Sequence, residues 1–99
     1  MLRVEIVFPL LDRDHNDVDF TACFDIIREI GYKCGGFRLS RVFGFWLSGS
    51  GEPFSEGTML LVTDTSFDNA SWFKEKIGQW QEALNQEAMY LSIHLVEWL

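Results

Sequence analysis

The sequence is short of cysteine, of basic residues and of long apolar runs, and each shortage excludes a class of protein. Its 99 residues include only two cysteines, Cys23 and Cys34, which do not form a CxxC pair. This excludes a small fold held together by disulfide bonds, so we expect both thiols to be reduced and the protein to be cytoplasmic. No run approaches the roughly 20 apolar residues that cross a membrane. Residues 1–14 lack the pattern of a cleaved leader, so we expect no membrane partner.

Basic residues number eight against fifteen acidic ones, which gives a net charge of −7. Nucleic acids are bound mainly through Lys and Arg, so direct nucleic-acid binding is disfavoured. The bases are also unevenly placed, because four lie between positions 28 and 41 and none lies within 42–73 or 77–99. An acidic surface of this kind suits a basic partner, and a nucleic-acid-binding protein is one candidate.

Apolar and aromatic residues are plentiful. At 47% hydrophobic, the chain can bury a core without disulfides or metal, and we expect one domain over residues 1–99. The fifteen aromatic residues comprise nine Phe, four Trp and two Tyr. These large side chains dominate both cores and interfaces, and fifteen exceed what a core of this size hides. We therefore expect some of them to lie on a binding surface.

Hydrophobic periodicity predicts four strands and two helices. Alternation predicts strands at 2–8, 37–48, 58–64 and 90–98, with Gly44 as a candidate bulge and 49–57 as a hairpin loop. A helical stripe from Phe20 to Ile30 predicts the first helix, capped by Asp17 or Asp19 and stopped by Gly31. A second stripe runs from Ala70 to Ala88, with Trp72 off it.

The order strand, helix, strand, strand, helix, strand predicts a ferredoxin-like α+β fold. In this βαββαβ arrangement two right-handed crossovers place both helices on one face of a four-stranded antiparallel sheet. The first and third strands are expected at the centre. Parity then places Leu60 and Val62 toward the core, and Met59 and Leu61 toward the open face.

The open face of this sheet is the predicted partner-binding surface. The strand residues that point toward this face include many aromatic and aliphatic side chains. Such side chains are common in protein interfaces and unfavourable in contact with water. We expect it to hold a second copy or another protein. The predicted partner-binding residues are Arg38, Val42, Trp46, Tyr90, His94 and Trp98.

No motif predicts a catalytic, cofactor or metal site. Asp12, Asp14 and Asn16 have the spacing of a calcium loop, but the required Gly and Glu are replaced by Asp17 and Cys23. The histidines, His15 and His94, show no zinc-ligand spacing. A string from Arg41 resembles an RNA-binding consensus, but it lies on the second strand and its phenylalanines share the core parity. We therefore expect no catalytic, metal or cofactor residues.

Two short motifs carry a resemblance to known proteins. The turn Gly35-Gly36-Phe37 and the Gln-Glu-Ala-x-Tyr-Leu run over residues 86–91 resemble a group of small bacterial proteins of unassigned function. That resemblance implies a ferredoxin-like fold and brings no catalytic residues. In topology alone the chain is also similar to dimeric α+β barrels, which include small monooxygenases and heme-degrading enzymes.

Three functional hypotheses follow. The first is a noncatalytic interaction domain whose open sheet face forms a homodimer or binds a partner. The second is an acidic inhibitor of a nucleic-acid-binding enzyme, of the phage anti-defence or anti-CRISPR type, supported by the net charge. The third is a dimeric α+β-barrel monooxygenase-like enzyme with His94 in its cavity.

Overall fold

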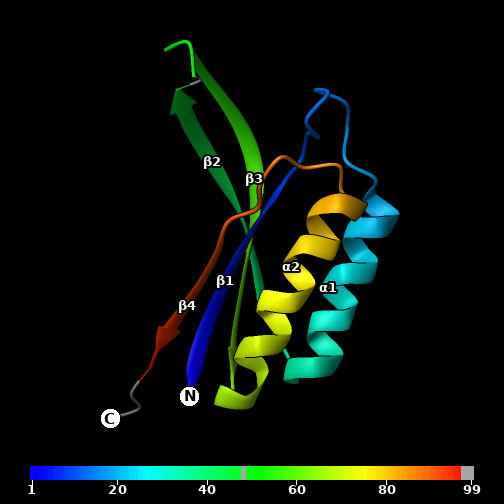
Figure 1. The fold of residues 1–99 in the computed structure, drawn as a ribbon, viewed down its shortest axis with the longest axis vertical. Helices are drawn as coiled ribbons and strands as arrows, with labels where there is room; N and C mark the ends of the chain where they lie inside the picture. Colours follow the sequence, from blue (N-terminus) through cyan, green and yellow to red (C-terminus); the bar gives the residue numbers. More distant parts are fainter. Residues whose placement is uncertain (48, 97–99) are drawn as a thin grey trace.

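The computed structural model describes residues 1–47 and 49–96, and its side-chain description excludes residues 46 and 54–56. The sheet has the order β2-β3-β1-β4 and all its pairings are antiparallel. Both helices cover one face (Figure 1). This confirms the ferredoxin-like fold and the central position of β1 and β3. The elements are β1 (Leu2–Pro9), α1 (Phe20–Cys34), β2 (Arg38–Leu47), β3 (Pro53–Thr65), the short 3₁₀ helix η1 (Phe67–Asn69), α2 (Ala70–Ala83) and β4 (Leu91–Leu95).

The core lies between the sheet and the two helices. Along β1, Leu2, Val4, Ile6 and Phe8 are buried and the residues between them are half-buried, which confirms the predicted alternation. The helices contribute further fully or nearly fully buried side chains to the same cluster. These are Cys23, Ile26, Ile27 and Ile30 from α1, Phe73 and Trp80 from α2, and Leu84 just after it.

Trp72 is half-buried and packs against this core, although it lies off the predicted apolar stripe of α2. Its ring meets Phe73 edge-on with a centroid separation of 4.9 Å and Trp80 with a separation of 5.6 Å. Such edge-to-face contacts stabilise aromatic clusters beyond simple burial. These contacts hold Trp72 against the core, while part of its side chain stays accessible to solvent.

Helix α1 begins at the predicted cap and runs past the predicted stop. The Asp19 carboxylate accepts the backbone N–H groups of Thr21 and Ala22 at 3.0 and 3.2 Å. The helix continues through Gly31 to Cys34, and Gly35 supplies the left-handed residue with φ 87°. A glycine inside a helix is destabilising but tolerated, so Gly31 alone does not end it.

The facing of β3 is opposite to the prediction. Leu61 pairs with Ile6 and is fully buried, and Met59 pairs with Phe8, so both face the helices. Leu60 and Val62 pair with residues of the open side of β1. A one-residue change of register exchanges the two faces of a strand, so the pairing with β1 decides the facing.

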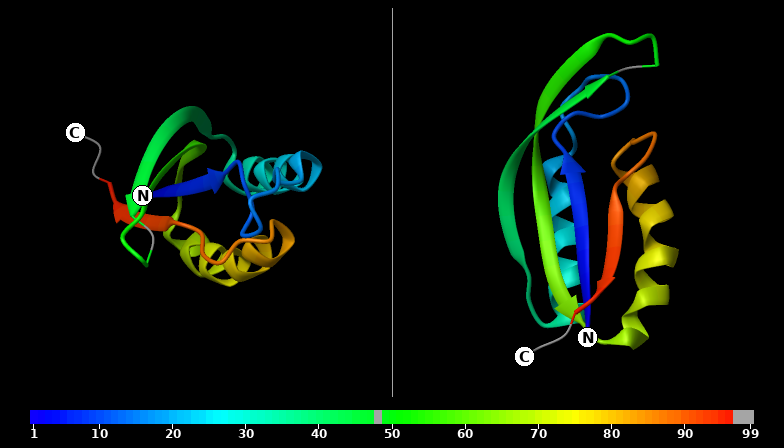
Figure 2. Two further views of the ribbon diagram at one scale, coloured as in Figure 1. Left: turned by 90° about the horizontal axis from the view of Figure 1, so that it is seen from above. Right: turned by 90° about the vertical axis from the view of Figure 1, so that its left-hand side faces the viewer.

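The β2–β3 hairpin is longer than predicted. Its ladder runs without interruption from Arg38 opposite Val62 to Leu47 opposite Pro53, so the described pairing contains no bulge at Gly44. Most of the predicted loop over 49–57 is therefore strand. The hairpin curves away from the helices at the end of the molecule opposite the N-terminus (Figure 2).

The loop between β1 and α1 is tied to the segment that follows α2. The Gln86 side chain is buried, and its Nε2 donates to the carbonyls of Leu11 and Leu84 at 3.0 and 3.2 Å. Arg13 donates to the Gln86 carbonyl at 3.0 Å. The Gln-Glu-Ala-x-Tyr-Leu run thus begins with a residue that joins two loops.

Candidate interaction surface

The outer half of the β2–β3 hairpin has no third strand beside it. β1 ends at Pro9, which pairs with Thr58, so residues 43–47 and 53–57 continue as a two-stranded extension about 17 Å long. We call these residues the projecting hairpin. Two-stranded hairpins are marginally stable in water unless something packs on them. This part of the molecule therefore has the least support from its own chain.

The projecting hairpin presents large apolar side chains to solvent. Phe43, Phe45 and Leu47 are 75%, 66% and 65% exposed. They share the strand parity of Leu39, which pairs with the buried Leu61, so they lie on the helix side of the sheet but beyond the helices. Contiguous exposed apolar side chains mark interaction sites on soluble proteins. The predicted core parity of these residues is correct, whereas their burial is not.

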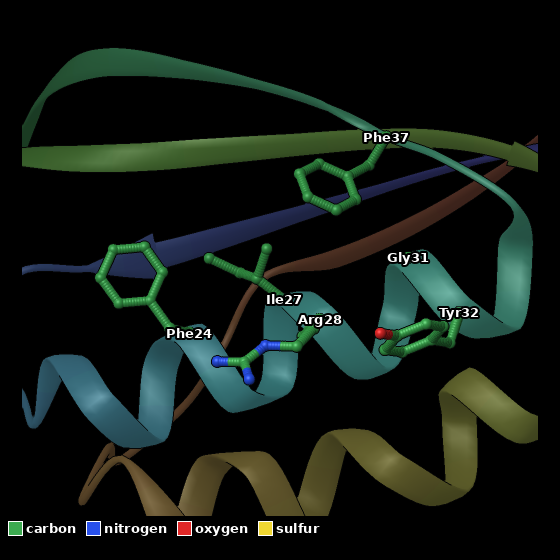
Figure 3. A pocket seen from close by; sticks show the side chains of 6 residues that line it. All are labelled: Phe24, Ile27, Arg28, Gly31, Tyr32 and Phe37. Carbon is green, nitrogen blue, oxygen red and sulfur yellow. The ribbon is translucent and has the colours of Figure 1, made fainter.

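A pocket of about 370 Å³ lies between α1 and the start of β2. The rings of Phe24 and Phe37 face each other across it, and Ile27 points into the space between them (Figure 3). The pocket is open to solvent. Two of its lining side chains are largely exposed, Phe24 at 53% and Tyr32 at 86%. Its lining residues are Phe24, Ile27, Arg28, Gly31, Tyr32 and Phe37.

The pocket depends on a glycine inside α1. A Cβ added at Gly31 would lie 3.0 Å from Cε1 of Phe37, closer than side chains normally approach. The absent side chain therefore lets the Phe37 ring lie against the helix. A glycine in a helix interior costs about 1 kcal/mol relative to alanine, and here it permits a close approach between helix and strand.

The open face of the sheet carries paired charges at one end. Arg3 donates to the Asp64 carboxylate from Nε and Nη2 at 2.9 and 3.3 Å. This hydrogen bond holds the pKa of Asp64 below its usual value and raises the pKa of Arg3. Arg38 adds a second, weaker positive influence on Asp64. Valine and leucine side chains occupy the neighbouring open-face positions at Val7, Val42, Leu60 and Val62.

We expect the Arg3–Asp64 pair to contribute stability that acid removes. Because the pKa of Asp64 is lower in the folded chain, its contribution is present above the unfolded pKa, near 3.8, and is lost as pH falls through the folded pKa. Asp64→Asn should therefore be less stable than wild type at pH 7, and the difference should close below about pH 4. Urea unfolding at pH 7, 4, 3 and 2 measures this. In an Arg3→Gln background the pH-dependent difference should shrink; an unchanged difference would contradict the assignment to Arg3.

His94 and Ser92 form a polar cluster on the open face. Ser92 Oγ lies 2.6 Å from His94 Nε2, and Glu5 Oε2 lies 3.9 Å from the same nitrogen. A catalytic triad needs the carboxylate on the opposite ring nitrogen, where it orients the imidazole. The cluster therefore has the geometry of a surface hydrogen-bond network.

The acidic loop after β1 is organised by its own backbone. The Asp12 carboxylate accepts the N–H groups of Asp14 and Asn16 at 2.8 and 3.0 Å, and the second of these bonds is the main cause of a lowered Asp12 pKa. Within residues 1–47 and 49–96 no group of three or more His, Cys, Asp or Glu side chains is placed to hold a metal ion.

The predicted partner-binding residues are spread over both edges of the sheet. Arg38 and Val42 are exposed on edge strand β2, and His94 is exposed on edge strand β4. Tyr90 is 55% exposed immediately before β4. Trp98 and the side chain of Trp46 lie outside the described residues. Sequence reasoning missed the pocket, and it missed the exposure of Phe43 and Phe45. The length of the hairpin was the signal needed for the two phenylalanines.

Comparison with known proteins yields structural matches only. No protein-family model matches the chain, and no curated protein sequence matches it. A CutA1 variant from Pyrococcus horikoshii matches with a TM-score of 0.73 at 14% identity, over 100% of this chain and 86% of that one. The fold is that of CutA proteins. The PII-like protein CutA from Nostoc sp. PCC 7120 gives a TM-score of 0.67 at 19% identity, over 98% of this chain and 82% of that one.

A protein other than CutA shares the same architecture. A phage SAM lyase in complex with S-methyl-5'-thioadenosine matches with a TM-score of 0.70 at 14% identity, over 94% of this chain and 79% of the lyase. At these identities the likeness to CutA and to the lyase concerns the fold.

None of the described helices is long and apolar enough to cross a membrane.

Proposed function

We propose that this CutA-like chain is a noncatalytic interaction domain that associates with copies of itself. The observation that carries the proposal is the projecting hairpin, which exposes Phe43, Phe45 and Leu47 on a two-stranded extension that its own helices do not reach. Water is a poor environment for such a surface, and a second chain would cover it.

The total surface of the chain supports this proposal. The solvent-accessible surface is 6418 Å², whereas a folded monomer of 11.5 kDa exposes about 5,800 Å². The excess of about 600 Å² approaches the roughly 800 Å² that each partner buries in a standard interface. The radius of gyration of 14.1 Å also exceeds the roughly 12.6 Å of a compact chain of this length.

The predicted open-face residues are proposed to extend the same interface. Arg38 and Val42 lie on the opposite side of β2 from the exposed phenylalanines, so one partner strand or loop beside β2 would meet both sides. Tyr90, His94, Trp46 and Trp98 remain proposed contacts on the basis of their sequence positions. We propose that the whole chain acts as one domain and that it works in the cytoplasm, where its two free cysteines would stay reduced.

Replacing Phe43 with threonine tests the proposal. Threonine keeps the strand propensity while removing the exposed ring, so the fold should be retained and self-association should weaken about tenfold or more. Sedimentation equilibrium over a concentration series measures the dissociation constant. Phe67→Thr is the matched control, because Phe67 is 62% exposed on η1, away from the hairpin. Wild-type protein that stays monomeric at every concentration, or equal association of Phe43→Thr and wild type, would count against the proposal.

A second candidate function is inhibition of a basic nucleic-acid-binding enzyme. The charge distribution favours it, since residues 42–73 contain no Lys or Arg and the net charge is −7. Binding to such an enzyme should weaken steeply with salt, whereas self-association through apolar side chains should not. The oxygenase hypothesis has less support, because the pocket beside α1 is not lined by His94.

A further inference from the structure

We propose that the pocket between α1 and the start of β2 binds a small, uncharged, planar aromatic molecule. The pocket lies apart from the projecting hairpin, because Phe43 is six residues beyond Phe37 along the extended chain, a separation of about 20 Å. The inference therefore goes beyond the proposed self-association and does not depend on it.

The size and lining of the pocket suit a small ligand. Its volume of about 370 Å³ falls near the lower end of the roughly 300–1,000 Å³ that small-molecule sites span. Phe24, Ile27 and Phe37 make the pocket mainly apolar, and Arg28 and Tyr32 supply its polar groups. Small-molecule sites have this composition, in which a few polar groups orient a ligand that is held by apolar contacts. The volume limits the ligand to about one or two rings.

The shape of the pocket favours a flat ring. The rings of Phe24 and Phe37 lie on opposite sides of it, and Ile27 points into the space between them (Figure 3). No side chain rises from Gly31 beside Phe37, so the surface of α1 stays low at this point. Aromatic rings attract one another in offset or edge-to-face geometry, beyond the benefit of burial alone. An aromatic molecule would therefore gain more from these walls than an aliphatic molecule of equal size.

The charges beside the pocket favour an uncharged ligand. The Arg28 guanidinium contacts the Asp25 carboxylate at 3.5 Å. Glu29, the next residue along α1, contacts Lys76 at 3.4 Å. An anionic ligand would have to compete with Asp25 for Arg28 and would approach a chain of net charge −7. A cationic ligand would approach the guanidinium in the pocket wall, so an uncharged ring avoids both repulsions.

The openness of the pocket sets the expected affinity. Phe24 is 53% and Tyr32 is 86% exposed, so a ligand between these side chains would keep part of its surface in water. Small-molecule sites that bind tightly enclose most of the ligand. For indole, an uncharged molecule of two fused rings, we expect a dissociation constant of about 0.1–1 mM.

Titration of the isotope-labelled protein with indole, followed by NMR, tests the inference. The amide signals of Gly31 and Phe37 should move in a saturable way, whereas the signal of Gly78 on α2 should stay in place. Phenol should bind about fivefold more tightly than cyclohexanol, its saturated counterpart, because only phenol offers a flat aromatic face. Indole-3-acetate and tryptamine, which carry opposite charges, should bind no more tightly than indole.

Two pairs of matched variants locate the site. Phe24→Gln removes one wall and should weaken indole binding about fivefold. Phe20→Gln should not weaken it, because Phe20 is 49% exposed on the same helix and does not line the pocket. Gly31→Ala would place a Cβ 3.0 Å from Cε1 of Phe37 and displace that ring, so it should also weaken binding. Gly78→Ala is its control, because a Cβ added there meets nothing within 4 Å.

Saturable shifts at Gly31 that are weakened in both pocket variants and kept in both controls would support the site. Absence of these shifts at about 10 mM indole, or unchanged binding in Phe24→Gln or Gly31→Ala, would overturn it. Equal binding of cyclohexanol and phenol would show that the pocket does not select aromatic rings. Tighter binding of indole-3-acetate or tryptamine would show that its ligand is charged. Circular dichroism of each variant checks that its fold is retained.

The inference and the proposed function can fail separately. Phe43→Thr should bind indole as the wild type does, because the projecting hairpin does not line the pocket. A wild-type protein that stays monomeric but binds indole would remove the proposed self-association and leave the inference standing. A protein that associates through Phe43 but shows no indole binding would do the reverse.

Discussion

Phe73→Ala is expected to lower the free energy of unfolding by about 3–5 kcal/mol, the largest single effect foreseen for this chain. Phe73 is fully buried on α2, and its ring lies at the centre of a cluster with Trp72 and Trp80, at centroid separations of 4.9 and 6.2 Å. Alanine would remove the ring and leave a cavity that two indole groups can only partly close. Because α2 is held to the sheet by this cluster, the loss should spread to the whole helix.

Urea unfolding followed by tryptophan fluorescence measures this effect, since Trp72 and Trp80 report on the cluster directly. Phe67→Ala provides the control: Phe67 is 62% exposed on η1, six residues earlier, and its loss should change the free energy of unfolding by less than about 0.5 kcal/mol. Equal effects at the two positions would mean that α2 is not packed as described.

Gln86→Ala is expected to cost about 2–4 kcal/mol, which is large for a polar residue. The buried Gln86 amide donates to the Leu11 and Leu84 carbonyls, and alanine would leave both without this donor. The loop after β1 would lose its link to the end of α2. Buried polar groups that lose a partner are penalised more than the average hydrogen bond stabilises.

Thermal unfolding of Gln86→Ala and Gln86→Glu tests this assignment. A carboxylate at this position is only an acceptor at neutral pH, so Gln86→Glu should restore none of the lost stability. Gln79→Ala is the control, because Gln79 is exposed on α2 and should change stability by less than about 0.5 kcal/mol. Full stability of the glutamate variant would show that the amide donors do not matter.

The element order and fold could be predicted because β1 and the two helices have one clear apolar face. β3 could not be oriented in this way, because Met59, Leu60, Leu61 and Val62 are apolar on both faces. Its helix-facing side also includes polar Thr63, which is buried because its hydroxyl donates to the Gly36 carbonyl at 2.6 Å. Alternation of hydrophobicity cannot reveal a hydroxyl that is satisfied inside the core.

The candidate site was harder to predict, because periodicity reports the face of a side chain and not whether anything covers that face. Phe43 and Phe45 have the parity of the core side of β2, yet the strand continues past the end of β1 and beyond the helices. In the same way Phe24 belongs to the predicted stripe of α1 but lies at its margin, and Ile26 takes the buried place. The pocket arises from this margin and from the absent side chain of Gly31.

The pairing of the strands also bears on the order in which the chain assembles. β2 and β3 are neighbours in sequence, whereas β1 joins strands about 60 and 90 residues away, as Leu2 opposite Thr65 and Leu95 shows. Closing such long loops is slow compared with forming a hairpin. The β2–β3 hairpin is therefore expected to form first. Its exposed phenylalanines would meet other chains before β1 and β4 complete the sheet, so aggregation would compete with folding at high concentration.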